Sequence, residues 1–148
     1  MIHTRPFAYA DTDQLHRMIW DLARYHDDAP SVTKETLLRD ITGAAPRARV
    51  LVADDGRALC GYAALVPQVS LQWGQRGVEL HHLRVDPDWR RRGVGRALID
   101  AAIDAARADG AETLSVGTHP DNSAAQAYYL ALGFSARPSR GPKFRLAL

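Results

Sequence analysis

The chain has 148 residues, of which 46% are hydrophobic and 24% charged, a length and composition that predict one globular domain spanning residues 1–148. Its net charge of +2 gives no general case for a nucleic-acid-binding protein, so nucleic acid is not expected as a partner. The single cysteine, Cys60, excludes an intramolecular disulfide and a cysteine-built metal site, and the absence of a signal-peptide pattern predicts a cytoplasmic protein.

The first elements expected are a strand and two helices. Residues 2–8 fit a short strand. Apolar side chains then recur at helical spacing over residues 15–22, and Asp11 or Thr12 can cap this helix. A second amphipathic segment ends at Gly43, a residue typical of helix C-termini.

Three antiparallel strands are expected next. Residues 49–53 and 59–69 are apolar runs on either side of a turn at 54–57, and a third strand follows over 77–85. The longest uncharged stretch, 58–75, contains glycine, proline, glutamine and serine. It is therefore too polar to span a bilayer, and no membrane partner is expected.

The C-terminal part alternates between helix and strand. Helices are expected over residues 93–108 and 122–132, and strands over 113–118 and 143–148, the last reached through the segment 136–142. The order of elements predicts an α/β fold: a mixed, mostly antiparallel central sheet with one β-α-β crossover and helices on both faces.

Residues 90–96, Arg-Arg-Arg-Gly-Val-Gly-Arg, have the chemistry of a pyrophosphate site. Gly93 and Gly95 allow the backbone to approach an anion closely, and the first amides of a helix have no acceptors within the helix. A dinucleotide fingerprint is disfavoured because Leu98 stands where its third glycine belongs. A Walker loop is excluded because its Gly-Lys-Ser/Thr is missing.

Two motifs carry a family resemblance. The first, Arg90-x-x-Gly93-x-Gly95 after the strand end Leu83-Arg84-Val85, resembles the acetyl-CoA signature of the GNAT superfamily of N-acetyltransferases. The second, about thirty residues later, resembles the C-terminal helix of that family: Asn122-x-x-Ala125-x-x-x-Tyr129-x-x-x-Gly133-Phe134. The two motifs lie in the family's order, and the resemblance covers nearly the whole chain.

The resemblance implies acetyl-CoA as cosubstrate, no metal, and a V-shaped cleft where the strand through Val85 carries a bulge and splays away from strand 113–118. It assigns the Leu83 amide to the acetyl oxygen and the Val85 amide to pantetheine. The cofactor-binding residues that it implies are Leu83, Arg84, Val85, Arg90, Arg91, Arg92, Gly93, Val94, Gly95, Arg96, Asn122 and Ala125.

The resemblance also implies a general acid and a base. The family pattern assigns Tyr129, rather than the neighbouring Tyr128, to protonate the departing thiolate. Glu79 and His81 share one strand face by period two, and either can serve as the base, as can water. His81 and His82 are adjacent on a strand and are therefore expected on opposite faces, which disfavours a metal site.

The expected function is transfer of acetyl from acetyl-CoA to a primary amine of a small molecule, by direct attack in a ternary complex. Residues 21–25 and 32–40 resemble the diamine and polyamine acetyltransferases, which are homodimers, so a homodimer is expected. That branch carries two acids where this chain has His81 and His82, so a polyamine acceptor stays an alternative. Acetylation of a protein amine also stays open, as does a non-catalytic acyl-CoA-binding module on the same fold.

Overall fold

The computed structural model describes residues 1–138 and 141–148, which divide into two compact units, Met1–Gly117 and Thr118–Leu148. Two residues of the predicted connecting segment 136–142 lie outside the described residues. The single domain expected from the length stays a prediction.

The first unit contains a five-stranded sheet with the strand order β1-β2-β3-β4-β5. Neighbouring strands are antiparallel except β4 and β5, which are parallel, so the predicted mixed and mostly antiparallel sheet is confirmed. The elements of this unit are β1 (His3–Pro6), the 3-10 helix η1 (Tyr9–Asp11), α1 (Thr12–Tyr25), α2 (Lys34–Thr42), β2 (Arg49–Asp54), β3 (Leu59–Ser70), β4 (Gln75–Val85), the 3-10 helix η2 (Pro87–Trp89), α3 (Val94–Ala108) and β5 (Thr113–Val116).

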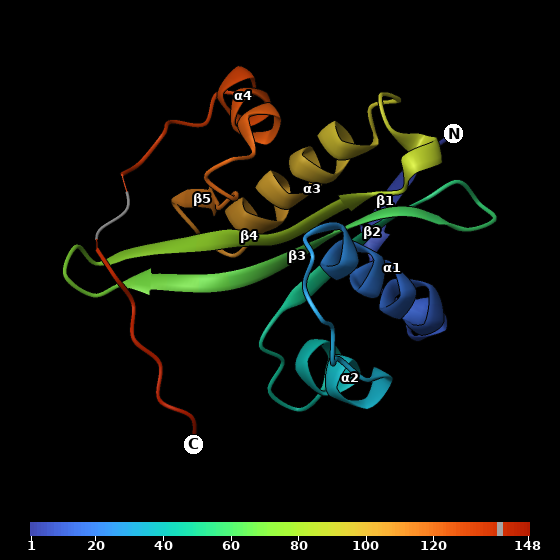
Figure 1. Cartoon of the computed structure of the whole chain (residues 1–148), viewed down its shortest axis with the longest axis horizontal. Helices are drawn as coiled ribbons and strands as arrows, with labels where there is room; N and C mark the ends of the chain where they lie inside the picture. Colours follow the sequence, from blue (N-terminus) through green and yellow to red (C-terminus); the bar gives the residue numbers. More distant parts are fainter. Residues whose placement is uncertain (139–140) are drawn as a thin grey trace. The chain divides into compact units, whose positions relative to one another are not determined.

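Helices cover both faces of this sheet, as predicted: α1 and α2 lie on one face and α3 on the other (Figure 1). Alternate residues of a strand point to opposite faces, so each strand supplies side chains to both layers. The core on the α1 and α2 side consists of Leu15, Met18, Leu37, Val50, Val52, Leu59, Tyr62 and Ala64. Its apolar area, removed from water, holds these two helices on the sheet.

On the other face, α3 approaches the sheet closely at Gly61. A Cβ atom added to Gly61 would lie 3.2 Å from Val94 Cγ1, 3.1 Å from Leu98 Cδ1 and 2.7 Å from the carbonyl oxygen of Arg84. Only a residue without a side chain fits there. This contact fixes the start of α3 against β3 and β4.

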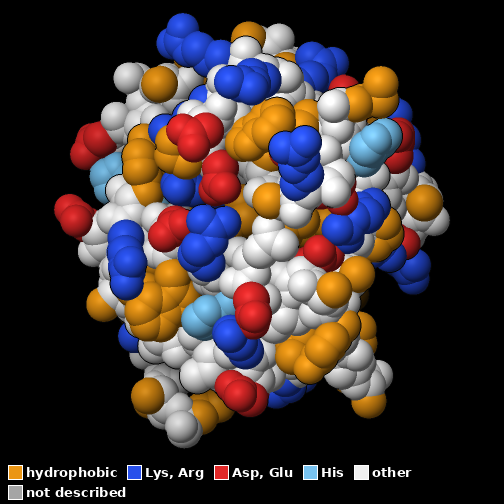
Figure 2. All heavy atoms as spheres, turned by 90° about the vertical axis from the view of Figure 1, so that its right-hand side faces the viewer, with side chains coloured by type: hydrophobic (Ala, Val, Ile, Leu, Met, Phe, Trp, Pro, Cys, Tyr) orange, Lys and Arg blue, Asp and Glu red, His pale blue; other side chains and the backbone are white. Residues whose placement is uncertain are grey.

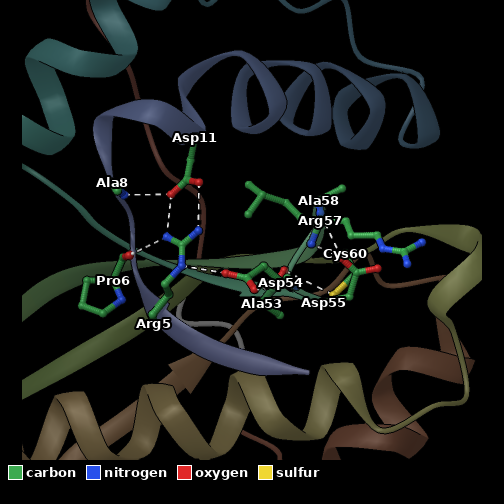
Figure 3. Close-up of polar contacts among 12 residues, drawn as sticks. Arg5, Pro6, Ala8, Asp11, Ala53, Asp54, Asp55, Arg57, Ala58 and Cys60 are labelled. Carbon is green, nitrogen blue, oxygen red and sulfur yellow. Dashed lines mark hydrogen bonds and ion pairs between the residues drawn. The ribbon is translucent and has the colours of Figure 1, made fainter. Parts of the chain in front are cut away.

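An ion-pair cluster joins the first strand to the rest of the sheet (Figure 3). Arg5 donates two hydrogen bonds to the carboxylate of Asp11, at 2.7 and 3.0 Å, and a third to Asp54 Oδ2 at 2.7 Å. Asp11 also accepts a hydrogen bond from the Ala8 amide at 2.8 Å. The cluster therefore ties β1, the start of α1 and the end of β2 together.

The pairing of β3 with β4 contains a β-bulge at His81. Ala64 pairs with His82 and Leu65 with Leu80, so His81 has no partner on β3. A bulge places two successive residues opposite one and interrupts the alternation of side chains. The expectation that His81 and His82 point to opposite faces is therefore wrong: their rings stack, with centroids 4.4 Å apart and planes 12° apart.

The pairing of β4 with β5 ends at Leu80 and Val116, while β4 continues to Val85. From His81 onward the edge of β4 that faces away from β3 has no strand beside it among the described residues. An open edge at this position agrees with the predicted splaying of the two strands. The V-shaped cleft itself stays a prediction.

In the second unit, the residues that the structure describes form one helix, α4 (Ser123–Ala131), close to the predicted range. The predicted strand over 143–148 is wrong, because these residues adopt no regular structure and are exposed. Alternating apolar side chains are compatible with a strand, but a strand forms only where a neighbour completes its hydrogen bonds. No helix in the described parts of the chain is long and apolar enough to cross a membrane.

Candidate functional site

The turn before α3 has the geometry of an anion site. Gly93 has a φ of +81°, the left-handed conformation that favours glycine, and Arg91 has a φ of +60°. The first hydrogen bond of the helix is donated by the Ala97 amide to the Gly93 carbonyl oxygen, at 3.0 Å. The amides of residues 94–96 therefore have no acceptor within the helix and are available to an anion, with the helix dipole adding positive potential.

Arginine side chains surround this turn. The Arg90 guanidinium lies 5.6 Å from the ring centroid of Tyr25, and that of Arg92 lies 5.1 Å from the ring of Trp89. Such cation–π contacts orient a guanidinium and leave its positive charge in place. The face of the molecule that carries this end of the sheet shows basic and acidic side chains interspersed (Figure 2).

The carboxylate of Glu79, on β4, is held from two directions. Its Oε2 accepts a hydrogen bond of 2.9 Å from the side-chain amide of Gln68, on β3, while its Oε1 lies 3.4 Å from His81 Nδ1. The Gln68 amide oxygen in turn accepts a hydrogen bond of 3.3 Å from the Ser115 hydroxyl, on β5. This network joins three strands at the point where β4 and β5 separate.

His82 lies behind His81 in a more buried position. Its Nδ1 lies 3.0 Å from the hydroxyl oxygen of Tyr62. Burial, with the adjacent His81 as a smaller cause, lowers the pKa of His82 to about 4, so this imidazole is neutral at neutral pH. A neutral ring that is hydrogen-bonded on one side gives His81 a fixed surface on which to stack.

Four of these side chains share one face of β4. Glu79, His82 and Arg84 pair with alternate residues of β3, and His81 contacts both Glu79 and His82. The partners of His82 and Arg84 on β3 are Ala64 and Tyr62, which belong to the core beneath α1. Leu83 and Val85 lie in the same stretch of β4, where its outer edge is open.

In the second unit, the candidate acid Tyr129 lies on α4. Partial burial raises the pKa of its phenol, so the hydroxyl keeps its proton at neutral pH. Its ring packs edge-on against Phe134, with centroids 5.5 Å apart. Asn122 caps the helix by accepting a hydrogen bond of 3.1 Å from the Ala125 amide, which accounts for the spacing of these two motif residues.

A metal site needs several His, Cys, Asp or Glu side chains close together, and thiol chemistry needs Cys60 to be reactive. Among residues 1–138 and 141–148, no group of three His, Cys, Asp or Glu side chains could hold a metal ion. Cys60 is buried, its thiol donates to the Ala53 carbonyl oxygen at 3.2 Å (Figure 3), and burial raises its pKa to about 11. Such a thiol is a poor nucleophile.

Within the first unit, the structure brings Glu79 and His81 into contact and places the acetyl-CoA signature at the start of α3. Sequence reasoning did not identify Gln68, Ser115 and Tyr62 as neighbours of these residues. Gln68 did carry a signal, because it is a polar side chain inside an otherwise apolar strand.

The chain is similar to a large group of known proteins. The model of the acetyltransferase (GNAT) family matches residues 12–134. Mycothiol acetyltransferase of Sanguibacter keddieii is 33% identical over 127 residues, which are 84% of this chain and 37% of that protein. The [ribosomal protein bS18]-alanine N-acetyltransferase of Escherichia coli is 43% identical over 56 residues, 38% of each chain. The matches therefore span just over a third of the length of these relatives.

Solved structures share the fold. An aminoglycoside acetyltransferase from an uncultured soil metagenomic sample, in complex with trehalose, superposes with a TM-score of 0.79 at 18% identity. The match covers 99% of this chain and 96% of that one. At this identity the likeness concerns the fold alone.

Proposed function

Since the chain belongs to the acetyltransferase (GNAT) family, we propose that it transfers an acetyl group from acetyl-CoA to a primary amine. The observation that carries the proposal is the turn before α3, where free helix amides, a left-handed Gly93 and arginine side chains converge. Pyrophosphate binds at such helix N-termini. In the first unit, the residues that would hold CoA are Leu83, Arg84 and Val85, through their backbone, and the turn 90–96. In the second unit, the resemblance proposes Asn122 and Ala125.

The proposed reaction is a direct attack in a ternary complex. The amine nitrogen forms a bond to the acetyl carbonyl carbon, and the thioester C–S bond breaks. An amine is mostly protonated at neutral pH, so it must first lose a proton, which Glu79 receives directly or through water. His81, in contact with Glu79, is the alternative base.

The proton that the departing thiolate needs comes from Tyr129 in this proposal. The raised pKa of its phenol supports the role, because a protonated hydroxyl is available throughout the neutral range. The Leu83 amide is proposed to bind the acetyl oxygen. A backbone donor aimed at the developing negative charge stabilises it without reorganisation.

The acceptor is proposed to be a small-molecule amine. A polyamine stays an alternative that rests on residues 21–25 and 32–40, as does the proposed homodimer. A protein amino group is a second alternative, supported by the name of the relative that acts on an alanine of ribosomal protein bS18. The cytoplasm is the proposed location.

A panel of primary amines with acetyl-CoA tests the proposal, with release of free CoA thiol as the readout. Mixtures without amine measure background hydrolysis. We expect thiol release that depends on the amine, and acetylated product by mass spectrometry. Tight acetyl-CoA binding with no turnover on any amine would instead support a non-catalytic acyl-CoA-binding module on the same fold.

A further inference from the structure

Arg84 is a buried cation without a counter-ion in direct contact. Its side chain is on β4, only 8% of the residue is exposed, and its Nε has no hydrogen-bond partner. No carboxylate lies within 4.0 Å of its nitrogens among the described residues. The contrast with Arg5 is clear, since that guanidinium contacts two carboxylates at 2.7 Å.

A buried guanidinium without a contacting carboxylate is costly. Arginine stays protonated in proteins, and a buried charge is normally paired or hydrogen-bonded. Asp86, two residues away, lies near enough for the charge of Arg84 to act on its pKa, but the ion-pair contact of this carboxylate is with Arg17, whose Nη2 lies 3.8 Å from Asp86 Oδ2. The chain thus leaves the hydrogen-bonding fork of Arg84 unused.

The fork remains accessible at its tip. Nε is the side-chain nitrogen of Arg84 that is both sealed from solvent and unpartnered, so the two terminal nitrogens keep contact with solvent. A ligand that binds them has no ion pair to displace. Packing holds the stem of the side chain, so little side-chain freedom is lost when the fork binds.

The neighbours of Arg84 connect it to the proposed reaction centre. Its side chain is on the same face of β4 as Glu79 and His81, and its backbone adjoins Leu83. The groups beside it on this face, Tyr62 and His82, are hydrogen-bonded to each other and neutral at neutral pH. They offer no negative charge to the guanidinium.

We propose that Arg84 binds a carboxylate of the acceptor, so that the acceptor is a free amino acid or a close analogue, with its amine and carboxylate on one carbon. This inference rests on the proposed function and narrows its acceptor. A carboxylate and a guanidinium form two parallel hydrogen bonds, the strongest pairing available to this side chain. A peptide N-terminus, which lacks the adjacent carboxylate, would leave Arg84 unpaired.

Three matched acceptor classes test the inference: L-amino acids, the corresponding amino acid amides, and the corresponding decarboxylated amines. For the wild-type protein we expect kcat/KM to be highest with the amino acids. Arg84→Gln should reduce kcat/KM for the amino acids about 10- to 100-fold, the loss of a charged hydrogen-bonded pair, and change the other two classes little. Arg76→Gln, at an exposed position on the same strand, is the matched control.

Arg84→Lys keeps the positive charge but not the fork, so it should retain part of the preference for amino acids. This variant also tests the inference if Arg84→Gln does not fold. The inference is overturned if the wild type treats the three classes alike, or if Arg84→Gln lowers all three equally. The increase in Tm caused by amino acids, compared with the increase caused by their amides, tests the same preference without requiring turnover. If no amine of any class is acetylated, the proposed function fails, whatever the stabilisation shows.

Discussion

The carboxylate of Glu79 has a different partner on each oxygen, Gln68 on one and His81 on the other. A carboxylate held in this way points in one direction, and a positioned base transfers protons more effectively than a freely rotating one. Gln68→Leu should therefore lower kcat/KM at neutral pH, measured by thiol release, because the carboxylate of Glu79 loses a partner that holds it in place.

Mutation separates the two candidate bases. If Glu79 accepts the proton, Glu79→Gln should lower kcat/KM at neutral pH by about 10²-fold or more, and the loss should shrink as pH rises because more of the amine arrives neutral. His81→Gln should chiefly raise the KM of the acceptor. The pH-dependent loss appearing in His81→Gln instead, with Glu79→Gln nearly unchanged, would transfer the role to His81.

The phenol of Tyr129 is expected to act on turnover rather than on binding. Tyr129→Phe keeps the ring that packs on Phe134 and removes only the hydroxyl. We expect kcat to fall by about 10²- to 10⁴-fold while the affinity for acetyl-CoA, measured by calorimetry, stays near that of the wild type. Tyr128→Phe is the matched control. Wild-type turnover in Tyr129→Phe, with chemistry rate-limiting, would exclude Tyr129 as the acid.

The start of α3 combines two requirements, a free set of amides and room for an anion. Gly95→Asp should abolish acetyl-CoA binding because a carboxylate at this position repels pyrophosphate. The same charge near a helix N-terminus favours the helix, so the variant should stay folded. Gly95→Asn has nearly the same size without the charge and should bind better than Gly95→Asp. Equal affinity of the wild type and Gly95→Asp in calorimetry would place the pyrophosphate elsewhere.

The helices and inner strands could be predicted because their signals are local. The apolar spacing of α1, the glycine after α2 and the turn between β2 and β3 all lie within a few residues of the structure that they specify. The resemblance predicted a bulge in β4, but no local signal gives its position at His81. It arises from how β4 pairs with β3, and nothing in the residues around His81 shows that one of them has no partner. The expected strand 143–148 failed for a related reason, because its pattern says nothing of a neighbouring strand.

The residues of the candidate site also fall into two groups, those that local motifs predict and those that only the fold brings together. Residues of the glycine turn and of α4 belong to motifs with fixed spacing, and the resemblance named them. The partners Gln68 and Ser115 are 11 and 36 residues from Glu79 in sequence, and only the sheet register brings them together. The isolation of Arg84 is a property of three-dimensional packing, since the sequence places Asp86 two residues away.

The ion-pair cluster around Arg5 makes the stability of the first unit depend on pH. Hydrogen bonds from Arg5 hold the pKa of the nearly buried Asp11 below its usual range. A carboxyl with a lowered pKa stabilises the folded state fully above the unfolded value, about 3.9, and the contribution is lost as pH falls through the folded value. Protonation of Asp11 therefore weakens the fold in acid.

Arg5→Met should lower the free energy of unfolding at pH 7 by about 1–3 kcal/mol, because Asp11 loses its charged partner. The difference from the wild type should narrow as pH falls below the unfolded value of about 3.9, because the wild-type protein progressively loses the contribution of the charged Asp11 there. Urea denaturation at a series of pH values measures both effects, and Arg107→Met, at an exposed arginine, is the control. A difference that is the same at pH 7 and pH 3 would contradict the role of Asp11.

The bulge at His81 has a consequence for how this protein can evolve. Because β3 pairs with Leu80 and then with His82, removing residue 81 would leave both neighbours in register and their side chains on the same faces as before. The position can therefore be substituted, or even lost, without disturbing the core. If the acceptor changes during evolution, residue 81 can be substituted with little loss of stability. Mutations at Leu80 or Leu83 would instead destabilise the fold.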